Sequence, residues 1–135
     1  MATDPITASV RIEAPPERVF PYFTEAEAMV RWMGDYALLD ARAGGEFAVD
    51  VRGVAVRGRY LELDPPHRLV FSWGHAGSER LPPGASTVEV RLRADADGTL
   101  VELTHSGLPE PDAPGHGRGW RHFLGELAEV AGAGG

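Results

Sequence analysis

The order of predicted elements near the N-terminus constrains the fold of this chain most. Residues 6–12 alternate between apolar and polar side chains, the pattern of a half-buried strand. Pro15 and Pro16 end this strand and favour the first turn of a helix, where a missing backbone N–H is not needed. Two short helical segments follow, ahead of a β-rich stretch that begins at Tyr36. One strand, two short helices and then a sheet is an unusual order.

The two helical segments are both predicted to be short. Residues 19–23 carry an apolar stripe, but Pro21 removes a donor that a helix interior would use, so the first helix is short or kinked. Thr24 and Glu27 form a capping-box signature for a second helix that reaches about Trp32. We expect the two helices to form a V across one end of the fold.

A meander of strands and one long helix make up the rest of the chain. Six further strands are predicted over residues 36–41, 46–51, 54–63, 68–73, 87–93 and 100–105. The last helix carries one apolar stripe at helical spacing, formed by Trp120, Phe123, Leu124, Leu127 and Ala131. We expect this stripe to cover the apolar face of an antiparallel sheet, within a single domain over residues 1–135 whose last residues, 131–135, are a frayed tail.

Four segments carry a resemblance to a known family: residues 14–34, 64–73 and 103–109, and the pair Gly119-Trp120 that opens the last helix. Together they resemble the SRPBCC superfamily, also called START-like or Bet v 1-like, in its branch similar to the C-terminal domain of the activator of Hsp90 ATPase. The resemblance covers roughly residues 6–130. It implies an α+β helix-grip fold, in which a curved seven-stranded antiparallel sheet wraps around a long C-terminal helix. It implies a shared fold and cavity more than a shared reaction.

Composition excludes several classes of function. The chain has no cysteine, which excludes thiol catalysis, zinc–thiolate sites and disulfides. It has no Lys, Asn or Gln, which is typical of a GC-rich bacterial genome. Its net charge of −7 would repel a polyanion, so we expect no nucleic acid partner. No signal peptide or membrane span is evident, which predicts a soluble cytoplasmic protein, either a monomer or a homodimer.

His105 is the candidate polar anchor of the cavity. Its phase in the strand places it inward, one step beyond Val101 and Leu103, where a ring nitrogen would meet a ligand or a water molecule. A core histidine whose nitrogens are satisfied by a backbone carbonyl or by a side chain near the helix start explains the same position. Both interpretations stay open.

Aromatic residues supply the walls of the predicted cavity. Trp32, Trp73 and Trp120 lie on the small helices, the sheet and the long helix, so they can converge on the interior and offer flat surfaces for stacking. Core packing explains them as well. The full set of candidate ligand-binding residues is Trp32, Phe47, Tyr60, Phe71, Trp73, His105, Trp120 and Phe123.

Two arginines would change the class of ligand if they pointed inward. Arg57 stands on the strand face opposite Tyr60, and Arg57 or Arg59 inside the cavity would imply an acidic ligand. The alternative is that both lie on the convex face and pair with Asp or Glu.

Catalytic, metal and cofactor sites find no support. The five histidines form no H-x-x-x-H pair, and no serine stands in a G-x-S-x-G elbow. Residues 115–119 are glycine-rich but lack the spacing of a dinucleotide loop, so we interpret them as letting the helix start pass close to the sheet. We predict no catalytic residue, no metal and no cofactor.

Three functions are compatible with these features. The first is binding of a small apolar or aromatic molecule in the cavity between sheet and helix. The second is a protein-interaction or co-chaperone-like role of the Hsp90-activator type, favoured if Leu81-Pro82-Pro83 formed an exposed apolar patch. The third is a cyclase or hydrolase of aromatic substrates, which requires at least two titratable groups inside the cavity. We rank the enzyme last. A separate prediction is that the loop of residues 74–86 gates the cavity mouth.

Overall fold

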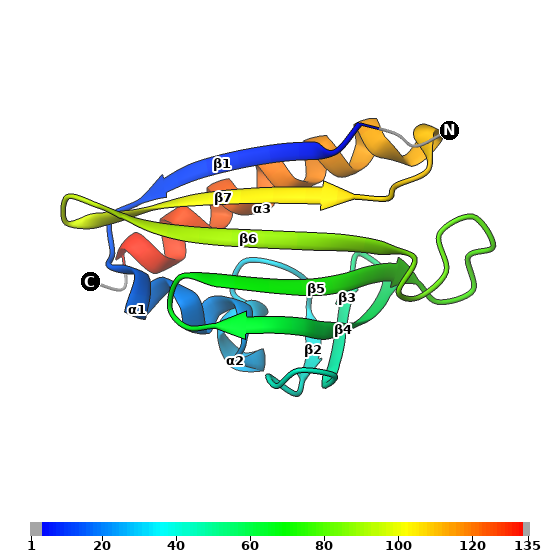
Figure 1. Ribbon diagram of the computed structural model, residues 1–135, viewed down its shortest axis with the longest axis horizontal. Helices are drawn as coiled ribbons and strands as arrows, with labels where there is room; N and C mark the ends of the chain where they lie inside the picture. Colours follow the sequence, from blue (N-terminus) through cyan, green and yellow to red (C-terminus); the bar gives the residue numbers. More distant parts are fainter. Residues whose placement is uncertain (1–3, 134–135) are drawn as a thin grey trace.

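A computed structural model describes residues 4–133 of the chain. Seven antiparallel strands form one sheet in the order β1-β7-β6-β5-β4-β3-β2. The strands are β1 (Ile6–Ile12), β2 (Tyr36–Leu39), β3 (Glu46–Val51), β4 (Val54–Asp64), β5 (Arg68–His75), β6 (Ser86–Asp95) and β7 (Gly98–Ser106). Strands β2 and β3 run in a clearly different direction from β1 and β7 (Figure 1), so the sheet is strongly curved. All seven predicted strands are confirmed, with ends that differ by at most two residues.

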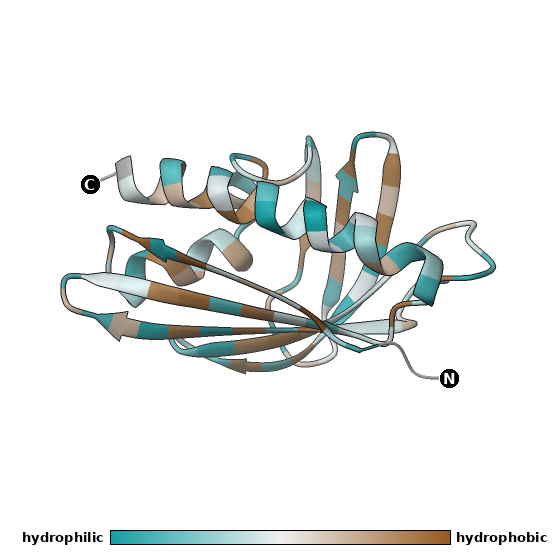
Figure 2. Cartoon of the chain, turned by 90° about the horizontal axis from the view of Figure 1, so that it is seen from above, coloured by the Kyte–Doolittle hydropathy of each residue, from teal (hydrophilic) through white to brown (hydrophobic). Residues whose placement is uncertain are grey.

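One long helix covers the concave face of this sheet. Helix α3 (Ala113–Ala133) follows a 3₁₀ turn, η2 (Glu110–Asp112), and lies over the sheet when the molecule is seen from above (Figure 2). The predicted apolar stripe faces the sheet: Trp120, Leu124, Leu127 and Ala131 are buried and Phe123 is half-buried. The helix-grip fold implied by the resemblance is therefore confirmed.

Three short helices cover one end of the sheet between β1 and β2. They are α1 (Pro16–Val19), the 3₁₀ segment η1 (Phe20–Phe23) and α2 (Ala26–Met29). Pro21 lies in the first turn of η1, so the expected break in the first helix is confirmed. These helices bury Phe23 and Met29 completely, which fills the space beneath them.

The predicted second helix differs from the observed one. Glu25, not Thr24, is the N-cap of α2, and no side chain caps it. The Thr24 N–H instead closes the preceding turn with the carbonyl of Pro21. The helix ends at Met29 rather than near Trp32, whose Nε1 donates to the carbonyl of Tyr22 at 2.9 Å. The local sequence pattern would extend this helix, but the helix ends early and the Trp32 ring packs on Phe23.

Candidate functional site

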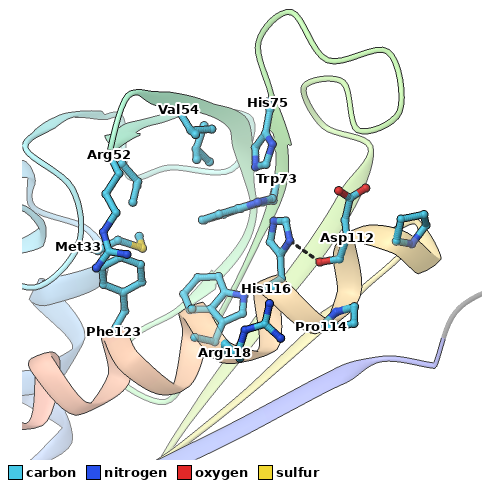
Figure 3. Close-up of a pocket in the computed structure, with 16 residues that line it drawn as sticks. Met33, Arg52, Val54, Trp73, His75, Asp112, Pro114, His116, Arg118 and Phe123 are labelled. Carbon is cyan, nitrogen blue, oxygen red and sulfur yellow. Dashed lines mark hydrogen bonds between the residues drawn. The ribbon is translucent and has the colours of Figure 1, made fainter.

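An open cavity of about 460 Å³ lies between the start of α3 and strands β3 to β5. Its mouth is completed by η2 and by the turn between β3 and β4. The lining residues are Met33, Val51, Arg52, Val54, Val56, Trp73, His75, Pro111, Asp112, Pro114, Gly115, His116, Arg118, Gly119, Trp120 and Phe123. Figure 3 shows this lining, with sheet residues on one side and helix residues on the other.

Glycines on α3 leave this space open. Gly115 and Gly119 lie one helical turn apart and both line the cavity. A Cβ atom built on Gly119 would meet no heavy atom within 4 Å, so even a small side chain there would project into empty space. Gly117 differs, because its Cβ would lie 3.5 Å from a methyl of Ile6 on β1. Only Gly117 therefore serves the predicted close approach to the sheet, whereas its two neighbours shape the cavity.

Two tryptophans form the flat part of the wall. The ring centroids of Trp73, on β5, and Trp120, on α3, are 5.0 Å apart, with the rings tilted by 52°. Phe123, Met33 and Val54 extend the apolar surface. Such a wall offers stacking and apolar contact to a flat molecule.

Two histidines give the cavity a polar end. His75, from the end of β5, stacks on His116, from α3, with ring centroids 5.4 Å apart and an interplanar angle of 15°. Burial lowers the pKa of His75, the charge of His116 lowers it further, and Asp112 opposes both effects. His116 Nδ1 lies 2.9 Å from the carbonyl oxygen of Asp112. Because a carbonyl only accepts, His116 Nδ1 is the donor in this hydrogen bond.

Asp112 ties the loop after β5 to this end of the cavity. Its carboxylate accepts two hydrogen bonds from Arg80, at 2.8 and 2.9 Å. These bonds are the largest cause of the lowered pKa of Asp112. Leu81, next to Arg80, is buried, so the loop of residues 74–86 is held by this side chain and by the ion pair. Within this loop, His75 is the residue that lines the cavity.

His105 is buried, as its phase predicted, and lies behind the cavity wall. Trp120 Nε1 donates to His105 Nδ1 at 2.9 Å, so the ring proton must sit on Nε2. Nε2 then donates to Ser86 Oγ at 2.8 Å, and the Ser86 hydroxyl donates to the carbonyl of Trp73 at 2.7 Å. Burial lowers the pKa of His105 to about 3 and keeps the ring neutral. Both nitrogens are thus used, as the interpretation of a satisfied core histidine requires.

The other predicted residues fall into three groups. Trp73, Trp120 and Phe123 line the cavity. Phe47, Tyr60 and Phe71 form a sealed cluster outside the lining, in which Phe47 stacks on Phe71 with centroids 4.2 Å apart. The Tyr60 hydroxyl donates to the carbonyl of Phe23 at 2.8 Å, and burial strongly raises its pKa. Trp32 lines a neighbouring hollow that shares Arg52 and Phe123 with the cavity.

Several cavity residues were not predicted from the sequence. Neither Arg57 nor Arg59, for which the sequence left an inward orientation open, lines the cavity. Arg57 pairs with Asp50 at 3.0 Å, and Arg59 donates to the carbonyl of Gly44. Arg52 and Arg118 line the cavity instead. The i, i+4 spacing of Gly115 and Gly119 is the sequence signal that would have indicated the opening, but the interpretation from sequence was a close approach to the sheet.

Residues 4–133 hold neither a metal-binding cluster nor a membrane-spanning helix. In residues 4–133, no three His, Asp or Glu side chains gather as a metal site would require. Nor does any helix within that range combine the length and apolar composition needed to cross a membrane.

Known proteins share this fold and sequence pattern. The family described as activator of Hsp90 ATPase homolog 1-like protein matches residues 13–132. An AHSA1-like protein from Rhizobium etli is 42% identical with a TM-score of 0.77, over 98% of this chain and 83% of that chain. CalU16 from Micromonospora echinospora is 34% identical with a TM-score of 0.77, over 94% and 75%. An HSP90 activator from Plasmodium falciparum is 25% identical with a TM-score of 0.79, over 96% and 97%.

No curated protein matches the chain. The family match nevertheless covers most of the sequence, and the fold agrees with the resemblance of the four segments. The chain belongs to the activator of Hsp90 ATPase homolog 1-like family, within the SRPBCC superfamily.

Proposed function

We propose that this protein binds a small, mostly apolar molecule in the cavity between the sheet and α3. The observation that carries the proposal is an open space of about 460 Å³ bordered by the adjacent rings of Trp73 and Trp120. Ligand sites of small molecules range from roughly 300 to 1,000 Å³ and combine apolar walls with a few polar groups. The cavity has both, since His75 and His116 stand at one end of the tryptophan wall.

The predicted residues take different roles in this proposal. Trp73, Trp120 and Phe123 contact the ligand directly, and Trp32 borders the adjoining hollow. His105 is a positioning residue, because it holds the Trp120 indole and, through Ser86, the backbone of Trp73. Phe47, Tyr60 and Phe71 support the wall from behind, through the contacts of Phe47 and Phe71 with Trp73.

The experiment fills the cavity from the helix. Gly119→Leu places a side chain into the open space, while Gly125→Leu is its matched control on the same helix, outside the lining. A Cβ on either glycine meets nothing within 4 Å, so both variants should fold. Binding of the neutral dye N-phenylnaphthylamine is measured by fluorescence titration.

We expect the wild type and Gly125→Leu to bind the dye alike, and Gly119→Leu to bind at least about tenfold more weakly. Native mass spectrometry of the gently purified wild type should also show a bound mass that Gly119→Leu lacks. A wild type that does not bind the dye, or equal binding by all three proteins, would overturn the proposal.

A second candidate function is an interaction of the Hsp90-activator type. The family match and the likeness to the Plasmodium falciparum HSP90 activator favour it. Leu81 is buried, however, so residues 81–83 do not form the continuous apolar patch that docking would use. The test is the ATPase rate of purified Hsp90 from the source organism with and without this protein; an unchanged rate would exclude stimulation.

A further inference from the structure

The cavity lining carries an excess of positive groups. Five of its side chains can carry charge: Arg52, His75, Asp112, His116 and Arg118. Asp112 is the acidic member, and Arg80 already neutralises its carboxylate through two hydrogen bonds. Neither lining arginine pairs with a carboxylate of residues 4–133. The cavity is therefore cationic in a chain whose net charge is −7.

The two arginines belong to different walls. Arg52 follows β3, and its guanidinium carbon lies 5.6 Å from the centroid of the Phe123 ring. Its Nη2 is 3.4 Å from Nε2 of His122, so aromatic side chains hold it at the apolar end. Figure 3 shows Arg52 across the cavity from Asp112, and Arg118 on α3 below His116. Positive charge thus stands at the sheet side and at the helix side of the same space.

Hydrogen bonding at the polar end favours an acceptor. Trp73 Nε1 is a buried donor with no partner among the described residues. Figure 3 shows this nitrogen on the side of His75 and His116. A buried donor without a partner costs free energy, and a ligand oxygen that reaches it removes that cost. A carboxylate or another anionic oxygen group supplies acceptors only, and arginine is the residue that pairs with such groups best.

We propose that the ligand of this cavity is an apolar acid. Its flat apolar body lies against Trp73 and Trp120, and the positive charges of Arg52 and Arg118, on two walls of the cavity, favour its anionic group. This inference rests on the proposed binding function and adds the chemical class of the ligand.

The experiment compares two dyes that have the same aromatic framework but differ in charge. Anilinonaphthalene sulfonate and N-phenylnaphthylamine share the same pair of aromatic groups, but only the first carries a negative charge. Both are titrated against the wild type, the double variant Arg52→Gln/Arg118→Gln, and Arg121→Gln. Arg121 is an exposed arginine of α3 outside the lining, so its variant reports the effect of removing a positive charge elsewhere on the helix.

We expect the wild type to bind the anionic dye at least about tenfold more tightly than the neutral one at low ionic strength. The double variant should lose about that factor for the anionic dye and change by less than about twofold for the neutral dye. Arg121→Gln should bind both dyes as the wild type does.

Two results would contradict this inference, and they are distinguishable. The inference that the ligand is an apolar acid would be wrong if the wild type bound the two dyes with equal affinity, or if the double variant lost affinity for both dyes equally. Either result would leave the binding function in place. Failure of the wild type to bind the neutral dye would overturn the binding function and the inference with it.

Discussion

The space beneath the sheet has two halves that differ in what covers them. Under η1 and α2, the aromatic side chains of Phe47, Tyr60 and Phe71 are buried and in mutual contact. Under the start of α3, the side chains of Trp73 and Trp120 border an open cavity. Strand β5 contributes to both halves, with Phe71 in the sealed one and Trp73 at the boundary. The sheet alone therefore does not decide where the cavity forms.

The covering elements make the difference. The short helices send large side chains down, and Phe23 and Met29 are completely buried. The first turns of α3 present Gly115 and Gly119 instead, which have no side chain to fill the gap. A close-packed interior leaves few voids larger than a water molecule, so an opening of this size marks a place where side chains do not fill the space between helix and sheet. The comparison predicts that the sealed half serves stability and the open half serves binding.

The largest expected effect is in the sealed half. Phe71→Ala should lower the free energy of unfolding by about 3–5 kcal/mol, because it removes a buried ring and leaves a cavity that neighbours cannot fill. The control is Val54→Ala in the open half, where Val54 is 41% exposed and the loss should stay below about 1 kcal/mol. Urea denaturation measures both. Similar losses in the two variants would mean that the halves are packed alike.

The second effect depends on pH and concerns the hydrogen bonds at the boundary. The pKa of His105 falls from 6.5 to about 3 on folding, so the unfolded state binds more protons between these values. The stability contribution is complete above about pH 6.5 and decreases as the pH falls, by up to about 1.4 kcal/mol per pH unit. His75, whose pKa burial also lowers, adds a contribution of the same sign.

The measurement is urea denaturation from pH 7 to pH 4. His105→Gln keeps an acceptor and a donor for Trp120 and Ser86 but has no titrating group, so its stability should depend less steeply on pH. His67→Gln, at an exposed site, should retain the wild-type slope. Equal slopes in all three proteins would show that His105 is not the group that titrates.

Much of the fold could be predicted because its signals are local. Alternation in the strands and the stripe from Trp120 to Ala131 each report one face of one element, and both were confirmed. The end of α2 could not be predicted, since the Trp32 indole bonds to a backbone carbonyl ten residues earlier. His75 and His116 come from β5 and α3, so nothing local pairs them. An open cavity is harder still, because its signal is the lack of a side chain.

A third effect separates the boundary from the protein surface. Ser86→Ala removes the side-chain donor to the Trp73 carbonyl and the acceptor for His105 Nε2, so the buried Nε2 loses its partner. We expect a loss of about 1–3 kcal/mol in the free energy of unfolding, together with weaker dye binding because Trp73 and Trp120 are held less firmly. Ser106→Ala, at an exposed position, should change stability by less than about 0.5 kcal/mol. A silent Ser86→Ala would mean that the network does not position the tryptophans.

The smallest effect is the most direct test of why the open half is open. Gly119→Ala should raise the free energy of unfolding by roughly 0.5–1 kcal/mol, because alanine favours the helix and its Cβ meets no atom within 4 Å. Gly125→Ala should give the same gain, since its Cβ is equally unobstructed. Only the methyl at 119 enters the cavity, so only Gly119→Ala should weaken binding of N-phenylnaphthylamine. Stability that rises while binding falls would show that glycine is kept at 119 for the ligand, at the expense of the helix. If Gly119→Ala instead lost stability, the glycine would be needed for packing, and the difference between the two halves would no longer be one of function.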